Sequence, residues 1–144
     1  MTSKLTRKAS GWIAGVAVTL LVILGGLFVA EAPQVYGGGC YTPFDQWISG
    51  ETTSYNRALQ YYFYGEAGAR VSIRMERDDT STMDPYLELA DPFGTVVAYN
   101  DDSAGSSNSW INGYRLPNSG CYTIIARSYQ NSTFGKFWLY ASWY

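Results

Sequence analysis

The sequence predicts a mainly β protein, a jelly-roll-like antiparallel β-sandwich preceded by one transmembrane α-helix. The helix is predicted by residues 12–30, an apolar run of 19 residues without a charge. Such a run spans about 28 Å as an α-helix and so matches the core of a bilayer. The sandwich is predicted by residues 40–144, where seven or eight short β-patterned segments are separated by regularly spaced turn signals.

Basic residues flank only the amino-terminal side of the apolar run. Lys4, Arg7 and Lys8 precede it, and the first 30 residues contain no acid. Because positively charged flanks stay in the cytoplasm, we expect residues 1–11 to be cytoplasmic and residues 40–144 to form a domain in the periplasm or outside the cell. The part from residue 31 onward carries seven basic residues against twelve acids, a net charge of −5. This balance excludes the basic footprint of a nucleic-acid-binding protein.

The apolar run fits a retained membrane anchor better than a cleaved signal peptide. A signal peptide would be cut after Ala30 or Ala32. The run is longer than the usual hydrophobic region of a signal peptide, the bulky Phe28 lies close to the first of these sites, and Pro33 follows the second. We therefore expect residues 12–30 to remain in the mature protein.

Small residues line one face of the expected helix. Gly11 and Gly15 form a G-x-x-x-G motif, and Gly25 and Gly26 lie on roughly the same face. Glycine lets helix backbones approach closely in lipid, so this face is a candidate contact with other transmembrane helices. Glycine is also common in membrane spans in general, and this second interpretation stays open.

The two cysteines, Cys40 and Cys121, both lie in the part expected to be exported. In an oxidising compartment an even pair predicts one disulfide, which would close a loop of about 80 residues and contribute about 4 kcal/mol. Two free buried thiols are the alternative. A lipid anchor on Cys40 fits less well, because residues 36–39 lack the aliphatic residue of a lipobox.

The remaining elements are predicted from local patterns. Residues 31–39, with a proline and three consecutive glycines, are expected to be a linker without regular structure. Strands are predicted where apolar and polar residues alternate, and Val71, Ile73 and Met75 share one face of such a segment. Turn signals such as residues 91–94 separate the strands. In chain order the expected strands are 59–64, 70–76, 86–90, 95–99, 110–116, 121–127 and 134–143.

The order of motifs in this part resembles the bacterial pre-peptidase C-terminal (PPC) domain family over about residues 55–142. The motifs are GARVSIRM at 68–75, DPYLEL at 84–89, DPFG at 91–94, NDDS at 100–103 and LPNSGCYTI at 116–124. The resemblance implies a jelly-roll-like β-sandwich of the kind appended to secreted proteases and similar to the collagen-binding modules of bacterial collagenases. Here only a membrane-length run precedes the domain, and Cys121 stands where the family usually carries threonine or another small residue. The family's usual role beside a peptidase is therefore not carried over.

The residue content excludes most catalytic chemistry. The chain has no histidine, which removes the commonest base and metal ligand and any Ser-His-Asp triad. It also lacks a P-loop, a dinucleotide fingerprint and a CxxC motif. Paired carboxylates need a sizeable cleft that a small domain of short strands rarely offers. We therefore expect a protein that is not an enzyme and has no small-molecule substrate.

Acidic residues gather in the expected loops. Asp84, Asn100, Asp101 and Asp102 are candidate Ca²⁺ ligands, because hard oxygen donors on adjoining loops are what this ion requires. The PPC resemblance supports this hypothesis, since related modules commonly bind calcium with loop acids. A wider set adds Asp78, Asp79 and Asp91. In the alternative interpretation these side chains only cap turns through Asx-type hydrogen bonds.

Aromatic residues are unusually frequent, with 5 Trp, 13 Tyr and 6 Phe. Half of those on strands must face the core, and the other half is free to form an exposed platform. The candidates for this platform are Tyr62, Tyr64, Trp138, Tyr140 and Trp143. We expect a protein contact, with a sugar ligand or the headgroup layer of a membrane as the alternatives.

These features predict a non-catalytic, single-pass accessory or structural subunit of a larger membrane protein complex. Its expected partners are other membrane protein subunits and the lipid bilayer, and its exported sandwich is expected to make protein contacts. One alternative is a free membrane-anchored module that binds a glycan or a protein. Another is an envelope filament subunit, although the glutamate expected early in the apolar helix of a pilin is missing.

Overall fold

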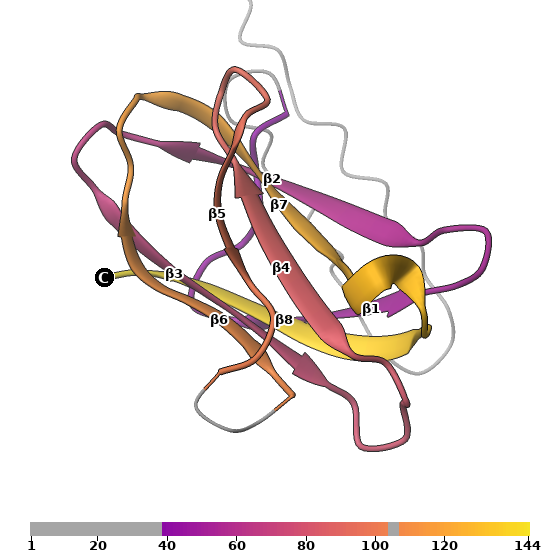
Figure 1. Cartoon of the computed structure of the whole chain (residues 1–144). Helices are drawn as coiled ribbons and strands as arrows, with labels where there is room; N and C mark the ends of the chain where they lie inside the picture. The colour runs from indigo at the N-terminus through magenta and orange to yellow at the C-terminus, as the bar shows by residue number, and fades with distance from the viewer. Residues whose placement is uncertain (1–38, 104–106) are drawn as a thin grey trace, which may run out of the picture. The chain divides into compact units, whose positions relative to one another are not determined.

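The computed structural model describes residues 39–103 and 107–144 (Figure 1). The expected membrane helix at 12–30, most of the linker at 31–39, and the glycines Gly11, Gly15, Gly25 and Gly26 lie outside the described residues. Within the described part, no helix has the length and apolar character needed to cross a bilayer.

The described residues form an antiparallel sandwich of two four-stranded sheets, with one short 3₁₀ turn. Sheet A has the strand order β1-β8-β3-β6, and sheet B has the order β2-β7-β4-β5. The strands are β1 (Trp47–Thr52), β2 (Ala58–Gly65), β3 (Arg70–Arg77), β4 (Pro85–Ala90), β5 (Val96–Asn100), β6 (Ser109–Arg115), β7 (Gly120–Ser128) and β8 (Gly135–Trp143); the turn is η1 (Tyr129–Asn131).

The strand pairing is that of a jelly roll. The first strand pairs with the eighth and the second with the seventh. The third pairs with the sixth and the fourth with the fifth. The chain is therefore one long antiparallel ribbon, folded so that successive pairs lie in opposite sheets. This arrangement confirms the expected two-sheet antiparallel sandwich.

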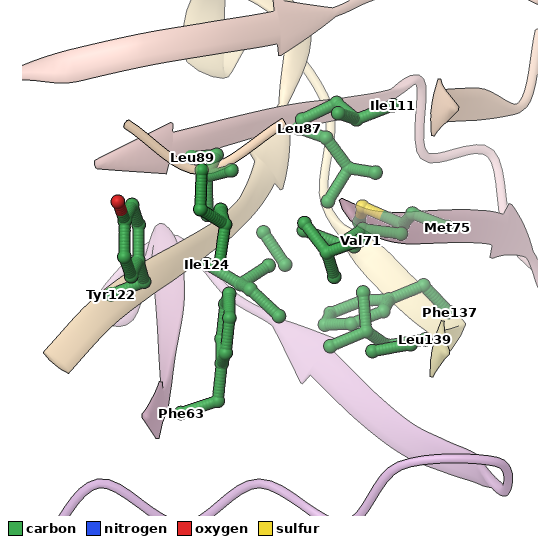
Figure 2. Close-up of a cluster of buried hydrophobic side chains, with 14 of the residues drawn as sticks. Phe63, Val71, Met75, Leu87, Leu89, Ile111, Tyr122, Ile124, Phe137 and Leu139 are labelled. Atoms are coloured by element: carbon green, nitrogen blue, oxygen red, sulfur yellow. The ribbon is translucent and has the colours of Figure 1, made fainter. Parts of the chain in front are cut away.

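The core fills the space between the two sheets (Figure 2). Val71 and Leu139 of sheet A face Leu87 and Ile124 of sheet B, and all four are fully buried. Phe63 and Tyr122 extend this core, with ring centroids 5.5 Å apart. Residues on the opposite side of each strand point outward, because side chains alternate along a strand. The alternation decides which aromatic residues are free to bind a partner.

Seven strands lie within one residue of the sequence prediction, but β1 was not predicted. Its sequence, WISGET, contains a glycine in mid-strand, which is a weak strand signal. The structure explains Gly50: a Cβ at this position would lie 2.3 Å from Cζ of Phe137 and 2.7 Å from Oη of Tyr61. Two aromatic side chains therefore occupy the space that any other residue at position 50 would need.

The loops divide between two ends of the sandwich. Gly65 pairs with Gly120 and Val71 pairs with Trp143, so the loops beside these residues share one end. We call it the Cys40 end; it comprises residues 39–46, 66–69, 91–95, 116–119 and 144. The opposite Asp84 end comprises the described residues of the loops 53–57, 78–84, 101–108 and 129–134.

A disulfide joins Cys40 to Cys121, with Cα atoms 5.6 Å apart, as predicted. It fixes the segment that leads into β1 against the start of strand β7. The same segment is held by a hydrogen bond from Thr42 Oγ1 to the Tyr62 carbonyl oxygen at 2.9 Å. A second bond runs from the Asp45 N–H to the Ala141 carbonyl oxygen at 2.8 Å. The leading segment thus closes the side of the sandwich between β2 and β8.

Candidate functional site

An aromatic row crosses the outer face of sheet A. The strand registers place Trp47 beside Tyr140, Tyr140 beside Arg74, and Arg74 beside Trp110. One residue of the row therefore comes from each of the four strands, in the order β1, β8, β3 and β6. We call these four residues the sheet A row. Each lies on the outward side of its strand, opposite a buried neighbour such as Ile73.

The sheet A row is accessible to a partner. Trp47 is 45% exposed and Trp110 is 44% exposed. Burial of these large aromatic rings against a partner would be energetically favourable. The Trp47 and Tyr140 rings pack together, with centroids 5.2 Å apart. An open hollow of about 450 Å³ lies along the row, a volume within the range of ligand-binding clefts.

Polar groups border the row on one side. Ser72 donates from its hydroxyl to Oδ1 of Asn112 at 3.2 Å and accepts from the Gly113 N–H at 3.0 Å. Ser142 and Tyr144 complete the lining of the hollow. Arg74 forms an ion pair with Glu76 on its own strand, and its side chain remains half exposed. The hollow therefore offers flat rings, one cation, and hydroxyl and amide groups within one area.

The five predicted platform residues do not form one surface. Trp138 and Tyr140 point outward on sheet A, next to or within the row. Tyr62 and Tyr64 point outward on sheet B, from its edge strand β2. Trp143 lies at the Cys40 end, with its ring stacked on Phe44 at a centroid distance of 4.7 Å. The positions of these five residues in the sequence did not indicate that they lie on different surfaces.

Sequence reasoning missed three members of the sheet A row. Trp47 lies on the unpredicted strand β1, and Trp110 and Arg74 are not among the predicted platform residues. A local signal existed for Trp110, because it alternates with the buried Ile111 along its strand. No local signal shows that Trp47 and Trp110, which are far apart in the chain, lie on the same row. That fact depends on the order of strands in the sheet.

A second aromatic group lies on the outer face of sheet B. Its centre is Tyr86, whose ring is 4.2 Å from the Arg127 guanidinium and stacked with the ring of Tyr99. Tyr129 also packs against Tyr86, with ring centroids 5.8 Å apart. Arg127 is bound in turn by Glu88 through two hydrogen bonds. Tyr86 and Arg127 are therefore engaged by their neighbours, whereas Tyr99 remains exposed.

The structure brings together three of the four predicted calcium ligands. Carboxylate oxygens of Asp84, Asp101 and Asp102 all lie within 4.8 Å of one another at the Asp84 end. Asp84 and Asp101 are partly buried and Asp102 is exposed. Burial raises the pKa of the Asp101 carboxyl, and repulsion from Asp102 and Asp84 raises it further, while Arg127 opposes this effect. A divalent cation here would relieve the repulsion that the three carboxylates share.

Asn100 has a different role from the three acids. Its side-chain oxygen accepts a hydrogen bond from the Trp110 N–H at 2.7 Å and another from the Ser103 hydroxyl at 3.3 Å. Its amide nitrogen donates to the Asp102 carbonyl oxygen at 3.5 Å. Asn100 therefore caps the turn and holds the loop that carries Asp101 and Asp102.

Two acids of the wider set also cap turns. Asp91 accepts hydrogen bonds from the N–H groups of Phe93 and Thr95 at 3.0 and 2.9 Å. Asp78 accepts from the Thr80 N–H and hydroxyl and from the Trp138 indole. The bonds from Thr80 lower the pKa of the Asp78 carboxyl. These carboxylates are already engaged by hydrogen-bond donors within the protein.

Residues 59–128 match the family model of the bacterial pre-peptidase C-terminal domain. This part of the chain is similar to a PPC domain. It runs from β2 to the end of β7 and carries the acid cluster. The PPC match leaves out β1 and β8, which contribute Trp47 and Tyr140 to the sheet A row. Half of the row thus lies outside the matched residues.

Solved structures with the same fold include the PPC domain of a collagenase from Bacillus anthracis. The TM-score is 0.54 at 16% sequence identity, over 69% of this chain and 90% of that one. The periplasmic lysozyme inhibitor PliG of Aeromonas hydrophila is also similar, with a TM-score of 0.46 at 17% identity over 67% and 85% of the two chains. No curated protein shows significant sequence similarity to this chain. At 16% identity the likeness to the collagenase domain establishes only the fold.

Proposed function

We propose that this chain is a non-catalytic, single-pass accessory subunit of a membrane protein assembly, and that the sheet A row is its contact with a partner protein. The observation that carries this proposal is the row of two tryptophans, a tyrosine and an arginine across four strands. These are the three residue types most enriched among the residues that dominate binding energy at protein interfaces.

The position of the row favours a protein partner. It lies on the outer face of a rigid sheet, so its side chains are held in place before binding and little conformational entropy is lost when a partner arrives. The hollow beside it is open to solvent along the row rather than enclosed, which allows a partner surface to reach it. The match to a PPC domain, and the absence of histidine from the chain, support a role in binding rather than catalysis.

The membrane part of the proposal comes from the sequence. Residues 12–30 form an uncharged run of bilayer length preceded by basic residues. Gly11 and Gly15 supply a small-residue face that suits contact with a partner helix. The assembly would therefore hold this subunit in two places, within the bilayer and at the exported sandwich.

Purification of the tagged full chain in mild detergent tests the proposal. A partner should copurify in fixed proportion, and Trp47→Ala with Trp110→Ala should reduce its yield. The control is Tyr99→Ala, an aromatic residue on sheet B that is 69% exposed and so more accessible than either tryptophan. If the double variant retains the partner as well as the parent does, the row is not the contact. Gly15→Ile tests the membrane contact separately, because it keeps the span apolar while holding the helices apart.

A free glycan-binding module is the second candidate, and one observation favours it. Ser72, Asn112 and Ser142 line the same hollow as the tryptophan rings, so apolar sugar faces and sugar hydroxyls would both find partners. In that case the detergent-purified chain should be a monodisperse monomer that is retained on cell-envelope polysaccharide. Loss of retention in the same double variant would then support the glycan. A polymer in detergent would instead indicate a filament subunit.

A further inference from the structure

An apolar hollow lies at the Cys40 end of the sandwich, apart from the sheet A row. It is lined by Tyr41, Thr42, Phe44, Phe63, Tyr64, Trp143 and the disulfide-bonded Cys40, and its surface is predominantly apolar. None of these lining residues carries a charge. Trp143 remains 46% exposed and Tyr64 remains 54% exposed, so the hollow is bordered by amphipathic rings.

Phe93 adds a more exposed apolar side chain to the same end. It lies in the turn between β4 and β5 and is 78% exposed. The turn is held in shape by Asp91, which accepts hydrogen bonds from the N–H groups of Phe93 and Thr95. With most of its surface in solvent, the Phe93 side chain does not stabilise the core. Contact with an apolar medium outside the sandwich would explain why this turn presents a phenylalanine.

Covalent and hydrogen bonds tie several segments of the Cys40 end to one another. The Cys40–Cys121 disulfide joins the leading segment to β7. The Ala67 N–H donates to the Ser119 hydroxyl at 2.9 Å, and the Tyr144 N–H donates to the Arg70 carbonyl oxygen at 2.9 Å. The Cys40 end is therefore a preformed surface rather than a set of independent loops.

Charge separates the two ends of the sandwich. The loops of the Asp84 end carry Asp78, Asp79, Asp84, Asp101 and Asp102, with Arg57 in a loop and Arg77 at a strand end beside them. The loops of the Cys40 end carry Asp45, Glu66 and Asp91, with Arg70 and Arg115 at the strand ends beside them. An anionic lipid surface would repel the first end more strongly than the second.

The chain connects the Cys40 end directly to the apolar run. The run ends at Ala30 and the described residues begin at Gly39. Nine residues reach at most about 30 Å when fully extended. The Cys40 end, which contains Gly39, is therefore within that distance of any bilayer that residues 12–30 enter. Tryptophan and tyrosine are the side chains that collect at the headgroup level of such a bilayer.

We infer that the Cys40 end is a membrane-docking surface, with Phe93, Tyr64 and Trp143 seated in the interfacial layer of the bilayer that holds residues 12–30. The inference rests on the membrane anchorage in the proposed function and adds an orientation to it. Docking in this way directs the acid cluster away from the lipid. It also leaves the sheet A row, on the side of the sandwich, free for a partner.

The test uses the full chain in vesicles of phosphatidylcholine and phosphatidylglycerol. Phe93→Cys carries an environment-sensitive dye, and the matched control is Tyr55→Cys, a fully exposed aromatic position at the Asp84 end. The native cysteines are bonded to each other and do not take the label. We expect blue-shifted emission at position 93 and quenching by headgroup-level nitroxide lipids, with water-like, unquenched emission at position 55.

A second pair of variants tests whether the native side chains cause the docking. In the labelled Phe93→Cys chain, Tyr64→Ser should reduce the quenching. Tyr62→Ser, on the same strand and face but further from the Cys40 end, should leave it unchanged. Equal, water-like emission at positions 93 and 55 in a chain that floats with the vesicles would overturn docking alone. A chain that does not float would overturn both docking and the proposed anchorage, whereas loss of the protein partner would affect only the sheet A row.

Discussion

The Arg127 guanidinium holds the Glu88 carboxylate with two parallel hydrogen bonds. Nε donates to Oε2 at 3.1 Å and Nη2 donates to Oε1 at 3.0 Å, between the neighbouring strands β7 and β4. Both side chains are about four-fifths buried, so water competes little for these bonds. Donating these hydrogen bonds to Glu88 also raises the pKa of Arg127 above its ordinary value.

We predict that Arg127→Met destabilises the sandwich by about 1 to 3 kcal/mol, because it leaves a largely buried carboxylate without its partner. Arg127→Lys should cost less, since it keeps the charge but loses the paired geometry. Denaturant unfolding of both variants measures the difference. In a double-mutant cycle, Glu88→Met should recover part of the loss caused by Arg127→Met. Strictly additive effects would show that the pair contributes no coupling energy.

The disulfide prediction concerns Cys40 and Cys121, which are 81 residues apart. Thiol labelling of the denatured, unreduced protein should find no free cysteine. Reduction, or replacement of both cysteines by serine, should lower the free energy of unfolding by about 4 kcal/mol, because the cross-link restricts the unfolded chain. Labelling of both cysteines in the unreduced protein would contradict the bond.

The pH prediction concerns Asp101, whose pKa is raised by burial and by its acidic neighbours. Between its unfolded pKa and its higher folded pKa, the folded chain binds more protons than the unfolded chain. The contribution of this group to stability therefore falls as pH rises through that window, and the penalty is fully present above it. Asp101→Asn should be more stable than the parent at neutral pH and should lose this advantage near pH 3. An equal difference in stability at both pH values would contradict the mechanism.

The cluster of acids that contains Asp101 is also the candidate calcium site. If Ca²⁺ binds between Asp84, Asp101 and Asp102, the melting temperature of the parent should rise with Ca²⁺ concentration and fall on chelation. Asp101→Asn should be stabilised without calcium but insensitive to it. Asp79→Asn, an exposed acid outside the cluster, should respond to calcium like the parent. A melting temperature that chelator leaves unchanged would favour turn capping as the role of these loops.

Gly50 gives a prediction about packing. Alanine at this position would bring a Cβ to 2.3 Å from the Phe137 ring, so the ring has to move within a filled core. We expect Gly50→Ala to cost about 1 to 3 kcal/mol of stability. Ser49→Ala, the outward-facing neighbour on the same strand, should be nearly neutral. Equal stability of the two variants would mean that Phe137 has room to rotate away.

Local patterns determined much of this protein without the structure. Alternation along Val71, Ile73 and Met75 placed a strand with one buried face, because side chains on a strand point to opposite sides. Turn signals such as residues 91–94 gave the strand limits to within a residue. Two cysteines in a part expected to be exported gave the disulfide. The apolar run at 12–30 remains a sequence prediction of a membrane span. Each of these features depends on residues close together in the chain, or on residue type alone.

Only the tertiary structure decided which residues act together. Trp47 and Trp110 share one row because β1, β8, β3 and β6 lie side by side in that order, and strand order depends on contacts between distant segments. The same order separated Tyr62 from Trp138, which the sequence had placed on one platform. Folding the ribbon also brought Asp84 to Asp101 and carried both to the end opposite Cys40. A binding surface is a property of neighbours in space, and the pairing of strands, rather than any local pattern, determines those neighbours.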